Sequence, residues 1–134
     1  MIRVIPKSTL AVQQLAKLRK LCGLSIAAIR DAAAGQESIR DVAIFSSQWQ
    51  SERLFLRDLS REYSSDTNAP FIVCEVNDYG LNEALTPLML RTRLEFWRGI
   101  ELEQQMQSDL DNGYISSPEE FFPHDEEWNQ QGSI

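Results

Sequence analysis

The sequence is poor in the residues that most catalytic and metal sites use. Its 134 residues include one histidine and two cysteines. The histidine, His124, lies between Pro123 and Asp125, far along the chain from Cys22 and Cys74. A nucleophile needs a base held against it, and a zinc site usually has more than one His or Cys ligand. The composition therefore argues against a hydrolase or a zinc enzyme, and we expect no catalytic residue, no metal site and no cofactor.

Several sequence motifs are absent as well. The chain contains no GxxxxGK[ST], GxGxxG, GxSxG or HExxH pattern and no EF-hand loop. The two cysteines lack CxxC spacing and lie in the apolar contexts KLCGL and FIVCEV, which favours buried thiols. No apolar run approaches the ~20 residues needed to span a membrane. The opening MIRVIPKSTL lacks the apolar centre of a signal peptide, so we expect a cytoplasmic protein without membrane contact.

Basic residues are missing from the last quarter of the chain. All 13 lysines and arginines fall within residues 1–98, which also hold 11 acids, so this part carries 13 − 11 = +2. Residues 99–134 hold the other nine acids and no lysine or arginine, which gives −9. Such a surface repels phosphates, so we expect no nucleic-acid binding through it. A basic protein is the expected partner, because opposite potentials speed encounter and disfavour wrong partners.

The pattern of apolar residues predicts an α/β fold of the α+β type. Residues 2–6 and 71–76 are β-branched, strand-like runs, and at least the second half of 38–45 is a third expected strand. Helices are expected after the cap signals at Ser8 or Thr9, at Ser25 and at Ser46–Ser47. Residues 1–76 therefore predict a two-layer β-α-α-β-α-β core with a small three-stranded sheet.

A long helix and a short tail complete the single domain expected for 134 residues. Thr86 and Pro87 mark a helix start, with Thr as the cap and Pro at the first helical position. This helix occupies residues 86–112, and its C-terminal half is expected either to project or to fold back along the domain. Residues 113–134 form an acidic, aromatic tail in which Ser117 and Pro118 start a short capped helix. Arg91, Arg93 and Arg98 of the long helix are expected to be solvated or paired with nearby acids.

The segment LRKLCGLSIAAIRDAA resembles the helix–Gly–helix part of the C-terminal domain of the bacterial ribosomal stalk protein. There a Thr-Gly-Leu-Gly-Leu run joins two helices, where this chain has Cys22-Gly23-Leu24-Ser25-Ile26. The order of strands and helices also matches over residues 2–76. In that family, basic residues of the two helices bind translation factors. The corresponding positions lie near Ala11, Ala16, Arg19 and Arg30, of which only the last two are basic.

The same segment is similar to small bacterial immunity proteins. These proteins carry a Gly-Leu-Ser helix hairpin followed by additional C-terminal helices, and each neutralises a cognate toxin. The resemblance implies that this chain binds a basic protein toxin. A nuclease is one such toxin, and carboxylates would then take the place of its phosphate substrate.

The C-terminal stretch NGYISSPEEFFPHDEEW mixes acids with large aromatic residues. Aromatic side chains anchor interfaces, and surrounding carboxylates pair with the Arg and Lys of a partner. The alternative is that the aromatics fasten the tail to the protein's own core, and the two roles are compatible. The predicted partner-binding residues are Glu101, Glu103, Asp109, Asp111, Tyr114, Glu119, Glu120, Phe121, Phe122, Asp125, Glu126, Glu127 and Trp128.

Together these observations predict a non-enzymatic binding protein, and specifically an immunity protein that blocks a basic toxin through its acidic face. The alternative is a translation-associated module that binds a translation factor through Arg19 and Arg30. A hydrolase or metal enzyme ranks third. The sequence does not indicate an oligomeric state.

Overall fold

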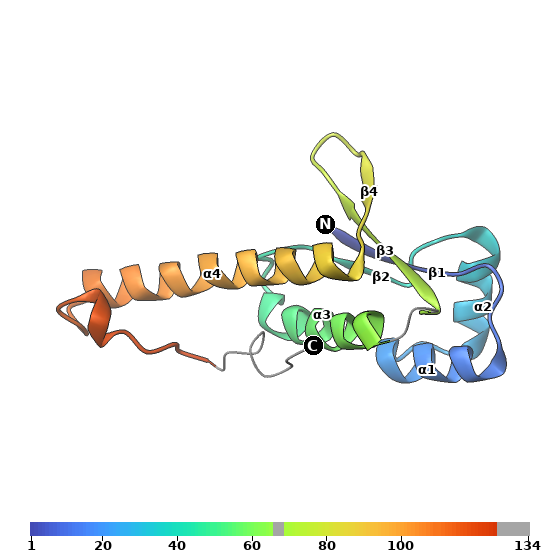
Figure 1. Cartoon of the computed structure of the whole chain (residues 1–134), viewed down its shortest axis with the longest axis horizontal. Helices are drawn as coiled ribbons and strands as arrows, with labels where there is room; N and C mark the ends of the chain where they lie inside the picture. Colours follow the sequence, from blue (N-terminus) through green and yellow to red (C-terminus); the bar gives the residue numbers. More distant parts are fainter. Residues whose placement is uncertain (66–68, 126–134) are drawn as a thin grey trace.

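The computed structural model describes residues 1–65 and 69–125 of the chain. Its elements alternate between short strands and helices before a single long helix (Figure 1). The elements are β1 (Ile2–Pro6), α1 (Val12–Cys22), α2 (Ile26–Gly35), β2 (Arg40–Val42), α3 (Trp49–Ser65), β3 (Phe71–Val76), β4 (Asn82–Ala84) and α4 (Pro87–Asp111), followed by one 3-10 turn (Pro118–Glu120).

The four strands form one antiparallel sheet in the order β2-β1-β3-β4. Ile2 of β1 lies opposite Val42 of β2, and Val4 lies opposite Val73 of β3. These side chains share one face of the sheet and are fully buried. Arg3, on the other face, is only half-buried, so the helices cover one face of the sheet and the fold has two layers.

The hydrophobic core lies between the covered face of the sheet and the four helices. Each helix contributes a buried aliphatic stripe at helical spacing, because residues three or four apart share one side of a helix. The two tryptophans at the end of the core, Trp49 of α3 and Trp97 of α4, meet edge to face with their ring centroids 6.0 Å apart. The helical core residues are Leu15, Leu18, Ile29, Trp49, Phe55, Leu56, Leu59, Leu90, Leu94 and Trp97.

The predicted α+β class is confirmed, and several predicted caps are observed. The Ser25 hydroxyl accepts a hydrogen bond from the Ala28 amide at 3.1 Å, which caps α2. Gly23 ends α1 with φ of 73°, a left-handed conformation that glycine adopts without steric cost. The Thr86 hydroxyl accepts from the Met89 amide at 3.1 Å and Pro87 occupies the first position of α4, as the sequence predicts.

The sequence predicts a sheet of three strands, whereas the observed sheet has four. Asn77 closes a tight turn after β3, where its side-chain oxygen accepts hydrogen bonds from the Tyr79 and Leu81 amides. The chain then returns as β4, so that Ala84 lies opposite Cys74. A three-residue Asn-Glu-Ala strand has low β-propensity and gives little signal in a sequence. The third predicted strand is also displaced, since β2 ends at Val42 and residues 43–45 lie outside it.

Helix α4 divides into two parts with different surroundings. Its first half packs on the core, whereas its second half extends beyond α3, and residues 112–125 run back along it toward α3 (Figure 1). We call residues 99–125 the arm and residues 1–98 the body. The structure thus resolves the two expectations for this helix: the helix itself projects, and the segment after it folds back. Among the described residues, no helix combines the length and apolar character needed to cross a membrane.

Candidate functional site

Two arginines lie buried where the arm joins the body. Arg53 of α3 and Arg98 of α4 both have side chains that are only 1% exposed. Each shares the buried side of its helix with a tryptophan: Arg53 is one turn after Trp49, and Arg98 follows Trp97. The packing of α3 against α4 therefore holds the two guanidinium groups next to each other.

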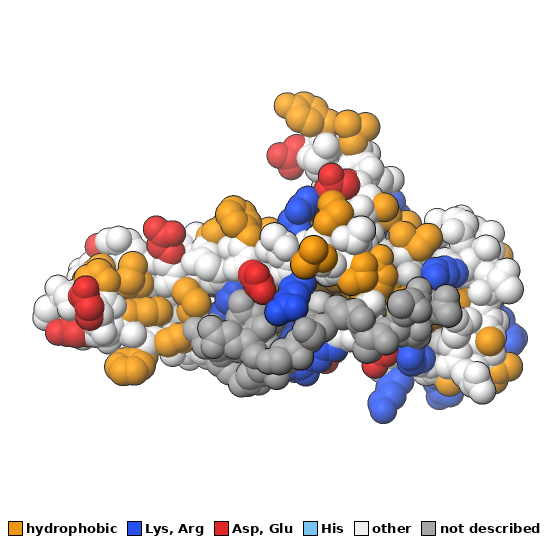
Figure 2. All heavy atoms as spheres, viewed as in Figure 1, with side chains coloured by type: hydrophobic (Ala, Val, Ile, Leu, Met, Phe, Trp, Pro, Cys, Tyr) orange, Lys and Arg blue, Asp and Glu red, His pale blue; other side chains and the backbone are white. Residues whose placement is uncertain are grey.

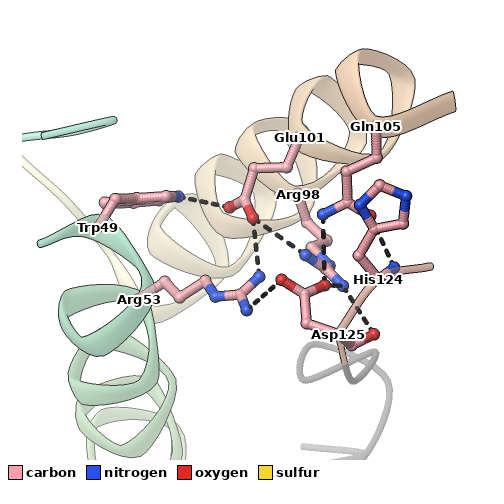
Figure 3. A network of polar contacts seen from close by, with 7 residues as sticks. All are labelled: Trp49, Arg53, Arg98, Glu101, Gln105, His124 and Asp125. Carbon is pink, nitrogen blue, oxygen red and sulfur yellow. Dashed lines mark hydrogen bonds and ion pairs between the residues drawn. The ribbon is translucent and has the colours of Figure 1, made fainter. Parts of the chain in front are cut away.

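Two carboxylates lie against these guanidinium groups (Figure 3). The Oε2 atom of Glu101 is 2.7 Å from Nη1 of Arg53 and 3.0 Å from Nη1 of Arg98. The Asp125 carboxylate bridges the same pair, with Oδ2 at 2.7 Å from Nη2 of Arg53 and Oδ1 at 2.5 Å from Nη2 of Arg98. We call these four residues the arginine–carboxylate cluster. Its formal charge is zero, which a buried set of ions requires.

Neutral side chains complete the cluster. The Trp49 indole Nε1–H donates a hydrogen bond to Oε1 of Glu101, so both oxygens of this carboxylate have partners. Gln105 contacts the last described residues twice: its Oε1 accepts from the His124 amide at 2.9 Å, and its Nε2 lies 3.5 Å from Oδ1 of Asp125. The end of the arm is thus bound through both backbone and side chain.

The surroundings of Asp125 stabilise its charged form. Burial alone would raise the pKa of this carboxyl group. The hydrogen bonds from Arg98 and Arg53, together with their positive charges, outweigh burial and hold the pKa below its ordinary value. Asp125 is therefore ionised at neutral pH, and its attachment to the arginines weakens only in acid.

A second, more exposed polar contact lies further along the arm. Nε2 of His124 is 2.9 Å from Oδ2 of Asp109, and the histidine side chain is about half exposed, at 48%. The His124 ring also lies near Phe121, with 6.1 Å between ring centroids. These contacts join the return segment to the C-terminal half of α4, and they give the single histidine a structural role.

The predicted partner-binding residues divide into two groups. Glu101 and Asp125 belong to the arginine–carboxylate cluster, Asp109 pairs with His124, and Phe121 is partly buried. The exposed group lies on the outer part of the arm and consists of Glu103, Asp111, Tyr114, Glu119, Glu120 and Phe122. Glu126, Glu127 and Trp128 lie outside the described residues.

The exposed group brings acids and aromatics onto one element. Tyr114 is 76% exposed and Phe122 is 80% exposed. The arm carries seven acids, which are the nine of residues 99–134 less Glu126 and Glu127, and it has no lysine or arginine. Figure 2 shows acidic and hydrophobic side chains together at the far end of α4, and basic side chains over the body.

The sequence prediction missed Arg53 and Trp49 as site residues. A signal existed, because Trp49, Arg53, Leu56 and Ser60 recur on one side of α3 and all four are buried. An arginine on such a stripe requires a buried carboxylate partner. The partner could not be identified from the sequence, since Asp125 lies 72 residues further along the chain.

A groove lies next to the arginine–carboxylate cluster. Beside the cluster, Glu101, Gln104, Gln105, Ser108 and His124 line a shallow groove of about 300 Å³. Among residues 1–65 and 69–125, no group of three or more His, Cys, Asp or Glu side chains is placed to hold a metal ion.

The two thiols also lie away from this groove. Burial raises the pKa of Cys22, against the opposing charge of Arg40, so this thiol is protonated at neutral pH. Cys74 is buried in β3.

Comparison of the chain with known proteins gives no match to a protein-family model, to a curated protein or to a solved structure. The resemblance to the ribosomal stalk domain and to immunity proteins therefore stays a prediction from residues 2–76.

Proposed function

We propose that the protein is a non-enzymatic binding protein that captures a basic protein partner through its arm. The observation that carries the proposal is the presence of exposed Tyr114 and Phe122 on an arm that has acids and no lysine or arginine. In its most specific form, the partner is a cognate bacterial toxin such as a nuclease, and the protein is its cytoplasmic immunity protein. No catalytic step, metal or cofactor is part of this role.

The exposed aromatics supply the affinity in this proposal. Aromatic side chains dominate interface energetics because they bury a large area with few rotatable bonds. Leaving two such rings in water costs free energy that burial against a partner recovers. Both rings are exposed, and both belong to the arm, whose helical part extends beyond α3 (Figure 1).

The exposed acids supply selectivity for a basic surface. Glu103, Asp111, Glu119 and Glu120 are exposed on the same arm. Carboxylates around an aromatic anchor pair with Arg and Lys of the partner, speed its approach and repel acidic competitors. On a nuclease they would occupy positions that bind phosphates, and the arm would block the substrate surface.

The arginine–carboxylate cluster has a supporting role in this proposal. It fixes the end of the return segment to the body through Arg53 and Arg98, so that Tyr114 and Phe122 are presented from a closed loop of chain and not from a loose tail. Ordering the binding surface in advance reduces the entropy lost on binding. Removing residues 114–134 would delete the aromatics and the Asp125 contact together, so point substitutions test the arm more cleanly.

The first test is the double substitution Tyr114→Ala with Phe122→Ala in the full chain. We expect it to weaken capture of a basic partner from the source cell by ~30-fold or more, since two truncated anchors cost about 1–2 kcal/mol each. The matched control is Val12→Ala with Tyr79→Ala, which removes body side chains that are 75% and 90% exposed. Equal binding by both double variants would overturn the proposal.

A second candidate function rests on the helix hairpin. Arg19 of α1 and Arg30 of α2 are both exposed, on two helices joined at Gly23. This is the arrangement that the stalk-like resemblance would need to bind a translation factor. The double substitution Arg19→Glu with Arg30→Glu separates the two functions, because it should abolish binding of a factor and leave capture by the arm almost unchanged.

A further inference from the structure

The two buried arginines form a receptor that is organised without Asp125. Their positions come from the packing of α3 on α4, where Trp49 meets Trp97. Glu101 then fixes both guanidinium groups, because its Oε2 atom contacts Arg53 at 2.7 Å and Arg98 at 3.0 Å. All five of these residues belong to the two packed helices and none to the return segment.

The Asp125 carboxylate occupies this receptor as a ligand would. Each of its oxygens contacts a different arginine, at 2.7 and 2.5 Å, which is the bridging geometry of a bound carboxylate. Its side chain is 20% exposed, whereas both arginines are 1% exposed. The two arginines therefore lie deeper in the protein than Asp125. Asp125 lies on the solvent side of them, next to the groove that Gln105 and His124 line.

Charge defines the class of anion that fits. Without Asp125, two arginines and Glu101 leave a net charge of 2 − 1 = +1. A single carboxylate replaces the charge of Asp125 without changing the total, whereas a sulfate or phosphate dianion would add one more negative charge next to Glu101. The cost of a net buried charge therefore favours monovalent carboxylates over dianions.

The site also contacts a peptide backbone. Oε1 of Gln105 accepts a hydrogen bond from the amide of His124, the residue before the bound aspartate, at 2.9 Å. A carboxylate bound between two arginines and an amide bound by Gln105 together describe an aspartate within a peptide segment that bends at the site (Figure 3).

We propose that Arg53, Arg98 and Gln105 form a binding site for an aspartate-containing peptide segment, and that Asp125 is its exchangeable occupant within the chain. The site is separate from the outer surface of the arm: it binds an acidic segment, whereas Tyr114 and Phe122 are assigned to a basic partner. An external segment that binds here displaces the end of the arm from the body. The tethered Asp125 competes at an effective concentration of about millimolar order, so external ligands bind the intact protein weakly.

The test uses the full-length Asp125→Ala variant, in which the receptor is vacated, with sodium formate as the probe. We expect the substitution to lower Tm by about 3–10 °C, and formate to restore most of this loss in a saturable manner. Half-saturation is expected at roughly 1–100 mM, because a ligand with so few atoms binds weakly even at its best. Sodium chloride and sodium sulfate at matched ionic strength should restore much less.

A local readout distinguishes site binding from a general salt effect. The Trp49 indole N–H donates to Glu101, which contacts both arginines, so its NMR signal reports on the cluster. Formate should move this signal in Asp125→Ala toward its wild-type position. Recognition of the peptide backbone is tested with the capped tripeptide Pro-His-Asp, which should restore Tm and the Trp49 signal at a lower concentration than formate. The capped tripeptide Pro-His-Asn should restore neither.

The matched control is Glu119→Ala, which removes an exposed acid of the same segment. Formate should not raise its Tm beyond the effect of chloride. A rise in Asp125→Ala that chloride reproduces, or an unmoved Trp49 signal, would overturn the proposal. If Asp125→Ala does not fold, Asp125→Ser replaces it with the same two readouts and the same expected results, because its short side chain also removes the carboxylate from between the arginines. Either result leaves the test of Tyr114 and Phe122 intact, since those residues are unchanged in these variants.

Discussion

The body is stabilised by one kind of force, and the arm is attached to it by another. Every buried hydrophobic side chain among the described residues lies between Ile2 and Trp97, and therefore within the body. The arm has no residue in the buried class. Its far end is attached by polar contacts instead: the ion pairs of the arginine–carboxylate cluster and the contact between His124 and Asp109. Apolar burial makes the body insensitive to moderate changes of pH, whereas the attachment of the arm depends on the charge of its carboxylates.

This difference supports the proposal that the arm is a binding surface. The body also leaves large apolar side chains exposed, among them Val12 at 75% and Tyr79 at 90%, so exposure alone does not distinguish the arm. What distinguishes the arm is that its exposed rings lie among acids and without a lysine or arginine. Tyr114 and Phe122 of the arm are exposed, because no apolar layer covers them within the part of the chain that the structure describes. A segment attached by a few polar contacts can expose such side chains without burying them in the core. The same segment can also detach from the body when those contacts are lost.

The largest expected effect comes from Arg53→Ala, which removes one of the two body arginines that hold the arm. The substitution leaves Glu101 and Asp125 facing a single arginine in a mostly buried site, and breaking such a pair costs about 3–5 kcal/mol. Urea unfolding followed by circular dichroism measures the loss. The matched control is Arg91→Ala, whose pair with Glu95 is surface-exposed and contributes about 0–1 kcal/mol. Equal losses for the two variants would mean that the cluster is not an anchor.

An intermediate, pH-dependent effect is expected from Asp125→Asn. At pH 7 we expect a loss of about 1–3 kcal/mol, since hydrogen bonds to charged groups are replaced by weaker ones. The folded-state pKa of Asp125 is lowered, so the stability it contributes is fully present above its ordinary, unfolded-state pKa and disappears as the pH falls through the lowered value. Unfolding curves of the two proteins should therefore converge in acid. A difference that stays constant from pH 7 to pH 2 would contradict this assignment.

The smallest effect is expected from His124→Ala. The pair with Asp109 is half exposed on the histidine side, so its loss should cost less than about 1 kcal/mol. Hydrogen exchange of residues 113–123 is the more sensitive measurement and should become faster, while exchange in β1 and β3 stays unchanged. A large global loss of stability would show that this pair, and not the cluster, fastens the arm.

The body was largely predictable from the sequence because its signals are local. The strands at 2–6 and 71–76, the cap at Ser25 and the Thr86–Pro87 start each depend on a few neighbouring residues, and the α+β class follows from their order. Strand β4 was missed because its pairing depends on a turn closed by Asn77 and not on its own composition.

The candidate site was predicted only in part because it depends on contacts across the chain. The acids and aromatics of the arm were identified from composition, but the sequence does not indicate which acids are used internally. Glu101 and Asp125 form ion pairs with Arg53 and Arg98. The pair between Arg53 and Asp125 joins residues 72 positions apart. Exposure of Tyr114 and Phe122 likewise follows from the path of the return segment.

The most direct test of the proposed function is a quantitative capture experiment. Three versions of this chain are used to capture binding partners from an extract of the source cell. These are the wild type, the arm variant Tyr114→Ala with Phe122→Ala, and the hairpin variant Arg19→Glu with Arg30→Glu. We expect a basic protein to be retained by the wild type and the hairpin variant and lost from the arm variant. Retention by the arm variant together with loss from the hairpin variant would contradict the assignment of the arm as the binding surface.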